Sequence, residues 1–104
     1  MRRQQTQLVT TEFVLLEVAD ALSARSLRSK TVAFVAGLRR MAVLEIVPAS
    51  SGVFDGGWQL YAARPDKDWG LTDCTSFWVM DQRAIVDVFT SDHHFTQAGF
   101  HKLL

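Results

Sequence analysis

Closely spaced acidic residues are the first feature of this sequence that could do chemistry. The stretch ARPDKDWGLTDCTSF, residues 63–77, places Asp66, Asp68 and Asp73 within eight positions. Like charges this close destabilise one another unless water, a cation or a hydrogen-bond donor offsets them. The stretch is therefore either a solvated loop that caps a helix or one wall of a metal site.

Two further acids, Glu17 and Asp92, extend the candidate set. Glu17 lies at the edge of the apolar stripe of a predicted helix, where Glu12 and Asp20 should reach solvent more easily. Asp92 ends a predicted strand, although aspartate is also a common turn residue. Asp73 falls in the first turn of a predicted helix, where capping alone could explain a carboxylate.

Taken together, Glu17, Asp73 and Asp92 can all face one end of a parallel sheet. Converging carboxylates suit a hard cation such as Mg²⁺ or Mn²⁺, because the ion offsets their repulsion and keeps water ligands for chemistry. Such an ion could polarise a phosphodiester and generate hydroxide. The acids therefore favour metal-dependent hydrolysis.

Other kinds of reactive site find less support in the residues. His93 and His94 follow Asp92 directly, but neighbouring strand residues point to opposite faces, so packing is the expected role of this pair. The sequence shows no Ser/His/Asp nucleophile signature, glycine-rich phosphate loop or CxxC motif. Cys74 is the single cysteine, which excludes an internal disulfide and favours packing as a small apolar residue.

The elements that must position these residues alternate between strands and helices. Hydrophobic spacing predicts, in chain order, strand 8–10, a helix capped by Thr10 or Thr11, helix 31–41, strand 43–47, helix 53–64, helix 71–80 and strand 84–92. This order indicates an α/β fold with a parallel sheet covered by helices. Ligands of such sheets bind beyond the carboxyl ends of the strands.

Composition favours one globular domain. The chain has 104 residues, of which 48% are hydrophobic, with zero net charge and no apolar run long enough for a membrane span or a signal peptide. The cytosol is therefore the expected compartment. Residues 1–52 carry seven basic and four acidic side chains, whereas residues 53–104 carry seven acids and four bases. This split is either ordinary surface charge or a phosphate-attracting rim beside an acidic pocket.

Three motifs resemble those of a known family. LVTTEFVLLEVADAL, DKDWGLTDCTSFWVM and FTSDHHFTQAGFHKLL, which run from Leu8 to the end of the chain, resemble successive motifs of the PIN-domain family, in its bacterial toxin-like (VapC-type) branch. The resemblance implies a three-layer α/β/α fold with a mostly parallel sheet. It also implies an acidic cluster that binds Mg²⁺ or Mn²⁺ and cleaves RNA.

The resemblance assigns the metal ligands and catalytic acids to three positions: Glu17, Asp73 and Asp92. Asp66 and Asp68 match an acidic pair of this branch, of which one could bind the metal through water. His94 and Phe95 match an HF pair that we interpret as packing and orientation.

The chain departs from the family pattern at its start. PIN domains resemble one another in opening with a strand that ends in a metal-binding aspartate, followed by two helices, and here the chain begins after them. We therefore expect residues 1–104 to form a single, N-terminally incomplete PIN-like domain. A fragment, a start assigned too late and a short form that closes its sheet with another copy remain open as explanations.

The resemblance implies a metal-dependent endoribonuclease that is the toxin of a toxin–antitoxin pair. The shortened chain could be an inactive form of this enzyme. Its implied partners are single-stranded RNA or structured RNA loops, an antitoxin protein and a second copy of the chain. Basic residues of the first half would contact the RNA backbone, and Trp69 could stack on a base.

The alternative is a non-catalytic PIN remnant that binds itself or another protein through exposed apolar surface. A phosphatase or receiver domain is a third reading, but its nucleophilic aspartate would also lie on the absent first strand.

Overall fold

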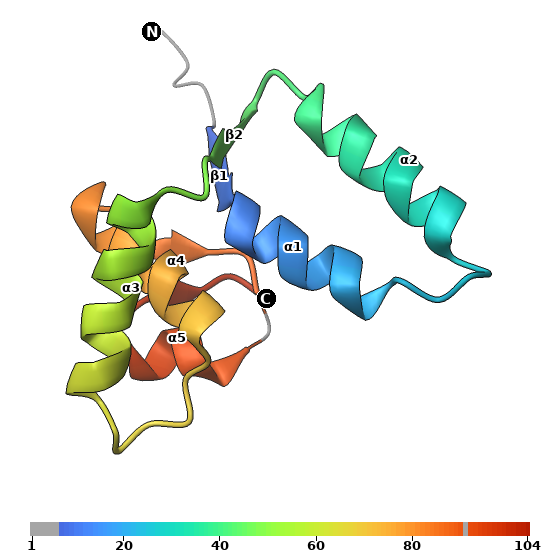
Figure 1. Ribbon diagram of the computed structural model, residues 1–104. Helices are drawn as coiled ribbons and strands as arrows, with labels where there is room; N and C mark the ends of the chain where they lie inside the picture. Colours follow the sequence, from blue (N-terminus) through green and yellow to red (C-terminus); the bar gives the residue numbers. More distant parts are fainter. Residues whose placement is uncertain (1–6, 91) are drawn as a thin grey trace, which may run out of the picture. The chain divides into compact units, whose positions relative to one another are not determined.

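The computed structural model describes residues 7–90 and 92–104 (Figure 1). The chain divides into two compact units, Met1–Ala49 and Ser50–Leu104, and each is considered by itself. The expectation of one domain over residues 1–104 therefore stays a prediction. Within the described ranges, every helix is too short or too polar to cross a bilayer.

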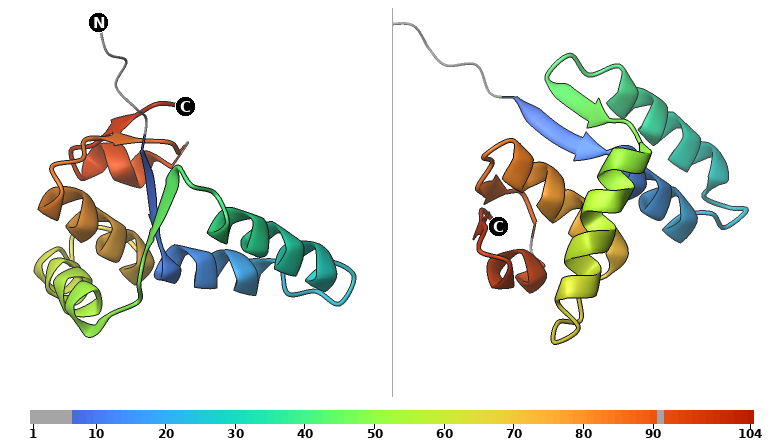
Figure 2. Two further views of the ribbon diagram at one scale, coloured as in Figure 1. Left: turned by 90° about the horizontal axis from the view of Figure 1, so that it is seen from above. Right: turned by 60° about the vertical axis from the view of Figure 1, so that its left-hand side comes forward.

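The N-terminal unit is built from two strands and two helices: β1 (Leu8–Thr11), α1 (Glu12–Ala21), α2 (Arg28–Arg39) and β2 (Leu44–Val47). β1 and β2 lie side by side and pair in parallel, with Leu8 opposite Leu44 and Thr11 opposite Val47 (Figure 2). A parallel pair needs a long crossover connection, which the two helices provide. The predicted element order and parallel pairing are confirmed here.

Two buried threonines fix the helices of this unit. Thr11 caps α1, because its hydroxyl accepts the backbone N–H of Val14 at 3.1 Å. The Thr31 hydroxyl lies 2.9 Å from the Leu22 carbonyl and 3.0 Å from the Leu27 carbonyl, and both carbonyls can accept its proton. These bonds hold the turn between α1 and α2 against α2.

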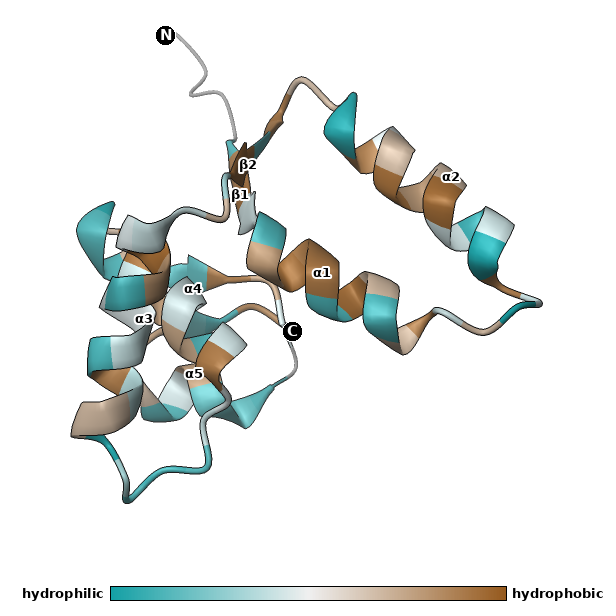
Figure 3. Ribbon diagram, in the orientation of Figure 1, coloured by the Kyte–Doolittle hydropathy of each residue, from teal (hydrophilic) through white to brown (hydrophobic). Residues whose placement is uncertain are grey.

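Several apolar side chains of this unit remain exposed. Apolar residues are spread along both α1 and α2 (Figure 3). Leu16, Val32 and Phe34 each keep more than half of their surface accessible to solvent. Leu15 and Val47 are buried, so the unit has an interior as well as an exposed apolar surface.

The C-terminal unit contains three helices and two short strands: α3 (Ser51–Ala63), α4 (Leu71–Gln82), β3 (Asp87–Val88), α5 (His93–Gln97) and β4 (His101–Lys102). β3 and β4 pair in parallel, so the described strands form two separate parallel pairs. The predicted strand 84–92 is wrong in extent, and α5 and β4 are additions to the predicted elements. Asp92 starts a helix instead of ending a strand, and α5 is too short to show helical periodicity.

Close contact between α3 and α4 organises the core of this unit. A Cβ atom at Gly57 would lie 2.6–2.9 Å from atoms of Thr75, so only glycine allows the helices to approach this closely. Beside this contact lies a buried cluster: Trp69, Cys74, Phe77, Met80 and Phe100. The Phe77 ring meets the rings of Trp69 and Phe95 edge-on, at centroid distances of 5.1 and 4.8 Å. These contacts fix the start of α4 and the short helix α5, which carry the candidate site.

Candidate metal centre

Asp73 lies in the first turn of α4, as the sequence predicts. Its Oδ2 accepts the backbone N–H of Gly70, the residue before the helix, at 3.3 Å. The neighbouring Cys74 is completely buried and anchors this turn in the core. Burial raises the pKa of the Cys74 thiol, and the Asp73 carboxylate raises it further. Capping is therefore one observed role of Asp73.

Asp92 caps the next site element, α5. Its Oδ1 accepts the backbone N–H of His94 at 2.9 Å, and its own N–H donates to the Thr90 hydroxyl at 3.1 Å. The prediction that Asp92 ends a strand is wrong, because β3 ends at Val88 and the capped helix begins directly after Asp92. The carboxylate is nevertheless held in a defined orientation.

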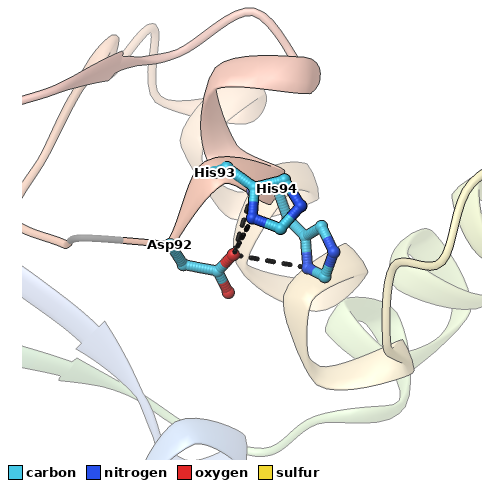
Figure 4. A group of neighbouring side chains, drawn as sticks. All are labelled: Asp92, His93 and His94. Carbon is cyan, nitrogen blue, oxygen red and sulfur yellow. Dashed lines mark hydrogen bonds and ion pairs between the residues drawn. The ribbon is translucent and has the colours of Figure 1, made fainter.

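His93 and His94 open α5, so the strand argument that separated their side chains is wrong. In a helix their rings lie 4.4 Å apart between centroids, and both approach the same carboxylate (Figure 4). The His93 Nδ1 lies 3.8 Å from Asp92 Oδ1, and the His94 Nδ1 lies 3.4 Å from it. The three side chains form a compact group of potential metal ligands.

The His94 ring also joins the two predicted acids of this unit. Its Nδ1 lies 3.6 Å from Asp73 Oδ2 as well as 3.4 Å from Asp92 Oδ1. The His94 and Asp73 side chains are mostly buried, with 22% and 24% of their surface exposed, whereas His93 is 71% exposed. The structure therefore brings Asp73 and Asp92 together around His94.

The buried His94 Nδ1 atom has no hydrogen-bond partner among the described residues. Its neighbours are carboxylate oxygens, which accept but do not donate. A positive charge between these atoms, from a proton on the ring or from a metal ion, offsets their mutual repulsion. Adjacent ligands of an octahedral ion with bonds of about 2.1 Å lie about 3 Å apart, and opposite ligands about 4.2 Å apart. The two separations that His94 Nδ1 makes, 3.4 Å to Asp92 Oδ1 and 3.6 Å to Asp73 Oδ2, fall between these limits. Among the described residues, the ligand atoms that all lie within 4.8 Å of one another are those of Asp92, His93 and His94, so these three residues fit a divalent cation and Asp73 adjoins them through His94.

Asp66 and Asp68 have other surroundings. The Nε and Nη2 atoms of Arg64 donate to the two carboxylate oxygens of Asp66, each at 3.0 Å. This pairing lowers the pKa of Asp66 and raises the pKa of Arg64. Asp68 is exposed and lines a surface hollow. Their contribution to a metal site stays a prediction.

Glu17 belongs to the N-terminal unit, and its surroundings differ from those expected. Its side chain is exposed on α1. Glu12, which was expected to reach solvent more easily, is instead the acid with protein partners. Its Oε1 accepts the Ala49 N–H at 2.7 Å, and its Oε2 lies 3.8 Å from Arg39 Nη1. The expected ranking of these two acids is wrong. The role of Glu17 as a metal ligand stays a prediction.

The predicted RNA contacts are partly described. Arg2 and Arg3 lie outside the described residues. The other basic side chains of the first half are exposed: Arg25, Arg28, Lys30, Arg39 and Arg40. The suggestion that Trp69 stacks on a base is wrong, because its ring is buried against Phe77 and its Nε1–H donates to Gln97 at 3.1 Å.

Sequence reasoning underrated His94, which lies at the centre of the site. The available signal was the spacing of Asp92 and His94, since an aspartate that caps a helix accepts an N–H two or three residues later. Reading Asp92 as a cap would have placed both histidines in a helix, where they can approach the same carboxylate.

Comparison with known proteins found similarity among solved structures. No protein-family model matches the chain, and no curated protein matches it either. Among solved structures, VapC20 of Mycobacterium tuberculosis, described as a toxin that cleaves the sarcin-ricin loop, is similar with a TM-score of 0.82. The two sequences are 25% identical, and the match covers 93% of this chain and 74% of the other.

Proposed function

We propose that this chain, a PIN domain of the VapC type by its fold, is the ribonuclease toxin of a toxin–antitoxin pair and depends on a divalent metal ion. The observation that carries the proposal is the unpartnered Nδ1 of His94, which faces one oxygen of Asp73 and one of Asp92. In a ribonuclease fold, a cation at this position would offset the repulsion between the carboxylates and would also assist hydrolysis of the phosphodiester.

The chain's own residues prepare this site. Backbone N–H groups at the starts of two helices orient the carboxylates of Asp73 and Asp92. Together with His94 they would hold Mg²⁺ or Mn²⁺, and Glu17 stays a predicted further ligand. When bound, the ion supplies a Lewis acid for a phosphodiester oxygen and lowers the pKa of bound water. The nitrogen ligand favours Mn²⁺ over Mg²⁺, because imidazole suits transition metals better than the harder Mg²⁺.

The proposed substrate is single-stranded RNA or a structured RNA loop, and the proposed location is the cytoplasm. VapC20, whose fold is similar, is described as a toxin that cleaves the sarcin-ricin loop. Exposed basic residues of the N-terminal unit, such as Arg25, Arg28 and Lys30, supply positive charge for phosphate contacts. An antitoxin protein is the expected regulatory partner.

Cleavage of RNA in the presence of Mn²⁺ tests this proposal. The wild-type chain should cleave a labelled RNA loop, whereas Asp73→Asn and Asp92→Asn should each lose about 100-fold or more of the rate, because each change removes a ligand charge. Asp55→Asn is a matched control, since Asp55 is an exposed residue of α3. Cleavage that persists in excess EDTA would contradict metal dependence.

Self-association without catalysis is the second candidate function. Exposed apolar residues on α1 and α2, including Leu16, Val32 and Phe34, favour contact with a second copy or another protein. Light scattering over a range of concentrations should then show a dimer, and Phe34→Glu should shift it toward monomer. A clear rise in melting temperature on addition of Mn²⁺ would argue against a purely non-catalytic role.

A further inference from the structure

Three aromatic side chains form a stripe along α3. Phe54, Trp58 and Tyr61 are 41%, 51% and 44% exposed. Their rings stack in succession, with centroids 6.2 Å apart for Phe54 and Trp58 and 5.7 Å apart for Trp58 and Tyr61. The spacing of four and three residues places them on one face of the helix.

The stripe is separate from the packing face of α3. That helix meets α4 through Gly56 and Gly57, which are buried, as is Val53. Large aromatic side chains left outside such a contact contribute little to the core of the unit. Several exposed together mark a binding surface more often than an isolated one does.

One end of the stripe opens into a hollow of about 640 Å³. Trp58 and Tyr61 line it from α3, and the loop that follows contributes Arg64, Lys67 and Asp68. This volume lies within the range of pockets that hold small ligands. The hollow therefore combines exposed aromatic faces with two cations and one carboxylate.

The same hollow reaches the start of α4, where the candidate metal centre begins. Gly70 and Cys74 line it, and between them in the chain lies Asp73, which accepts the Gly70 N–H at 3.3 Å. A group bound in the hollow would therefore be close to a carboxylate of the metal site. Arg64 is already fixed there, because it binds both oxygens of Asp66 and lies 5.2 Å from the centre of the Trp69 ring.

We propose that this hollow binds one nucleotide of the RNA strand beside the cleaved phosphate, with its base stacked on Trp58 or Tyr61. The inference rests on the proposed ribonuclease function. Every base offers a π-face to an aromatic side chain, and the ammonium group of Lys67 in the lining suits the phosphate of a single nucleotide. An apolar protein surface would use the stripe but leave Lys67 without a group to bind, whereas Arg64 is already paired with Asp66, so the observations favour RNA.

Binding of labelled single-stranded RNA of about ten nucleotides, measured by fluorescence anisotropy in EDTA, tests the inference without cleavage. Trp58→Leu and Tyr61→Leu should each weaken binding about 5- to 150-fold, the usual loss for a stacked base. Phe89→Leu is the matched control, because Phe89 is a 74% exposed aromatic residue of the same unit and lies outside the hollow's lining. Circular dichroism should show that all three variants remain folded.

A strand of the same length with abasic sugars separates stacking from charge. The wild-type chain should prefer the strand with bases, and Trp58→Leu should reduce that preference. Equal affinity of the wild type for both strands, unchanged binding by both variants, or no RNA binding at all would overturn the inference. Reduced self-association of Trp58→Leu with unchanged RNA binding would also overturn it and assign the stripe to a protein partner.

The proposed function can fail separately from this inference. If the proposed metal-dependent function is wrong, the wild type should neither bind Mn²⁺ nor cleave RNA. The stacking experiment is done in EDTA, so its result does not depend on metal binding. Trp58→Leu should in turn leave Mn²⁺ affinity unchanged. The ion pairs of the metal site join His94 to Asp73 and Asp92, whereas the Trp58 ring stacks on Phe54 and Tyr61.

Discussion

The two compact units of the chain bury their apolar residues to different extents. In the C-terminal unit, Cys74 and Phe77 are almost fully buried within one aromatic cluster. Among the described residues, the N-terminal unit buries two apolar side chains, Leu15 and Val47, and the C-terminal unit buries seven, although both units also leave apolar side chains such as Phe34 and Phe89 more than half exposed. The better-packed unit carries the converging acids and His94, so the groups that need a fixed geometry are held by the tighter core.

The groups that we propose for RNA binding in the N-terminal unit need a less precisely fixed position than metal ligands do. The exposed basic residues of this unit suit phosphate contacts, which depend on charge more than on exact placement. Glu17 would be the exception if it serves as the proposed metal ligand, because such a ligand must be held in a defined position and the Glu17 side chain is exposed. Replacement of a core residue in the C-terminal unit should therefore lower stability more than replacement of an exposed apolar residue in the N-terminal unit.

Replacement of a core aromatic residue should give the largest effect. Phe77→Ala should lower the free energy of unfolding by about 3–5 kcal/mol, because the ring is only 1% exposed and contacts Trp69, Phe95 and Phe100. Phe34→Ala should change it by less than about 1 kcal/mol, since that side chain is mostly exposed. Urea denaturation measures both values, and equal losses would remove the contrast between the units.

A methyl group at the contact between Gly57 of α3 and Thr75 of α4 should give a smaller loss. Gly57→Ala should destabilise the chain by about 1–3 kcal/mol, because the new Cβ would lie within 2.9 Å of backbone atoms of Thr75. The same denaturation experiment checks it.

The matched change in the other unit should have the opposite sign. Gly37→Ala, within α2, places a Cβ where no atom lies within 4 Å, so it should stabilise the helix by about 0.5–1 kcal/mol. A destabilising Gly37→Ala would show that α2 needs glycine for a contact beyond the described packing.

Alkaline pH should reveal the burial of Cys74. The folded-state pKa of the thiol is raised by burial and by Asp73, so the unfolded chain loses its thiol proton first as the pH rises. Stability should therefore be unaffected by this group at neutral pH and should fall above the ordinary thiol pKa, by at most about 1.4 kcal/mol per pH unit. Cys74→Ala should flatten this alkaline slope in pH-dependent denaturation; an unchanged slope would assign it to other groups.

The sequence predicted elements with strong periodicity and missed those set by local capping. Helices α1 to α4 and the parallel strands β1 and β2 follow hydrophobic spacing that Leu15, Val47 and Phe77 illustrate. α5 contains five residues and depends on the cap that Asp92 provides, which periodicity does not register. Because the cap was not predicted, the approach of His93 and His94 to the Asp92 carboxylate was not predicted either.

The candidate site was predictable in part for the same reason. Asp73 was placed correctly, because an acid at the start of a buried helix is a strong local pattern. The pairing of Asp66 with Arg64 and the engagement of Glu12 depend on side-chain conformations that spacing along the chain does not determine. The same holds for the unpartnered nitrogen of His94, since it arises from contacts between α4 and α5.

Calorimetric titration with Mn²⁺ tests the central claim, a metal site at Asp73, Asp92 and His94, most directly. The wild-type chain should bind Mn²⁺ more tightly than Mg²⁺. Asp73→Asn and Asp92→Asn should each weaken Mn²⁺ binding by at least about 10- to 100-fold, while Asp55→Asn leaves it unchanged. His94→Gln should reduce the preference for Mn²⁺ over Mg²⁺. Absence of Mn²⁺ binding by the wild type, or equal binding by all of these variants, would contradict the account.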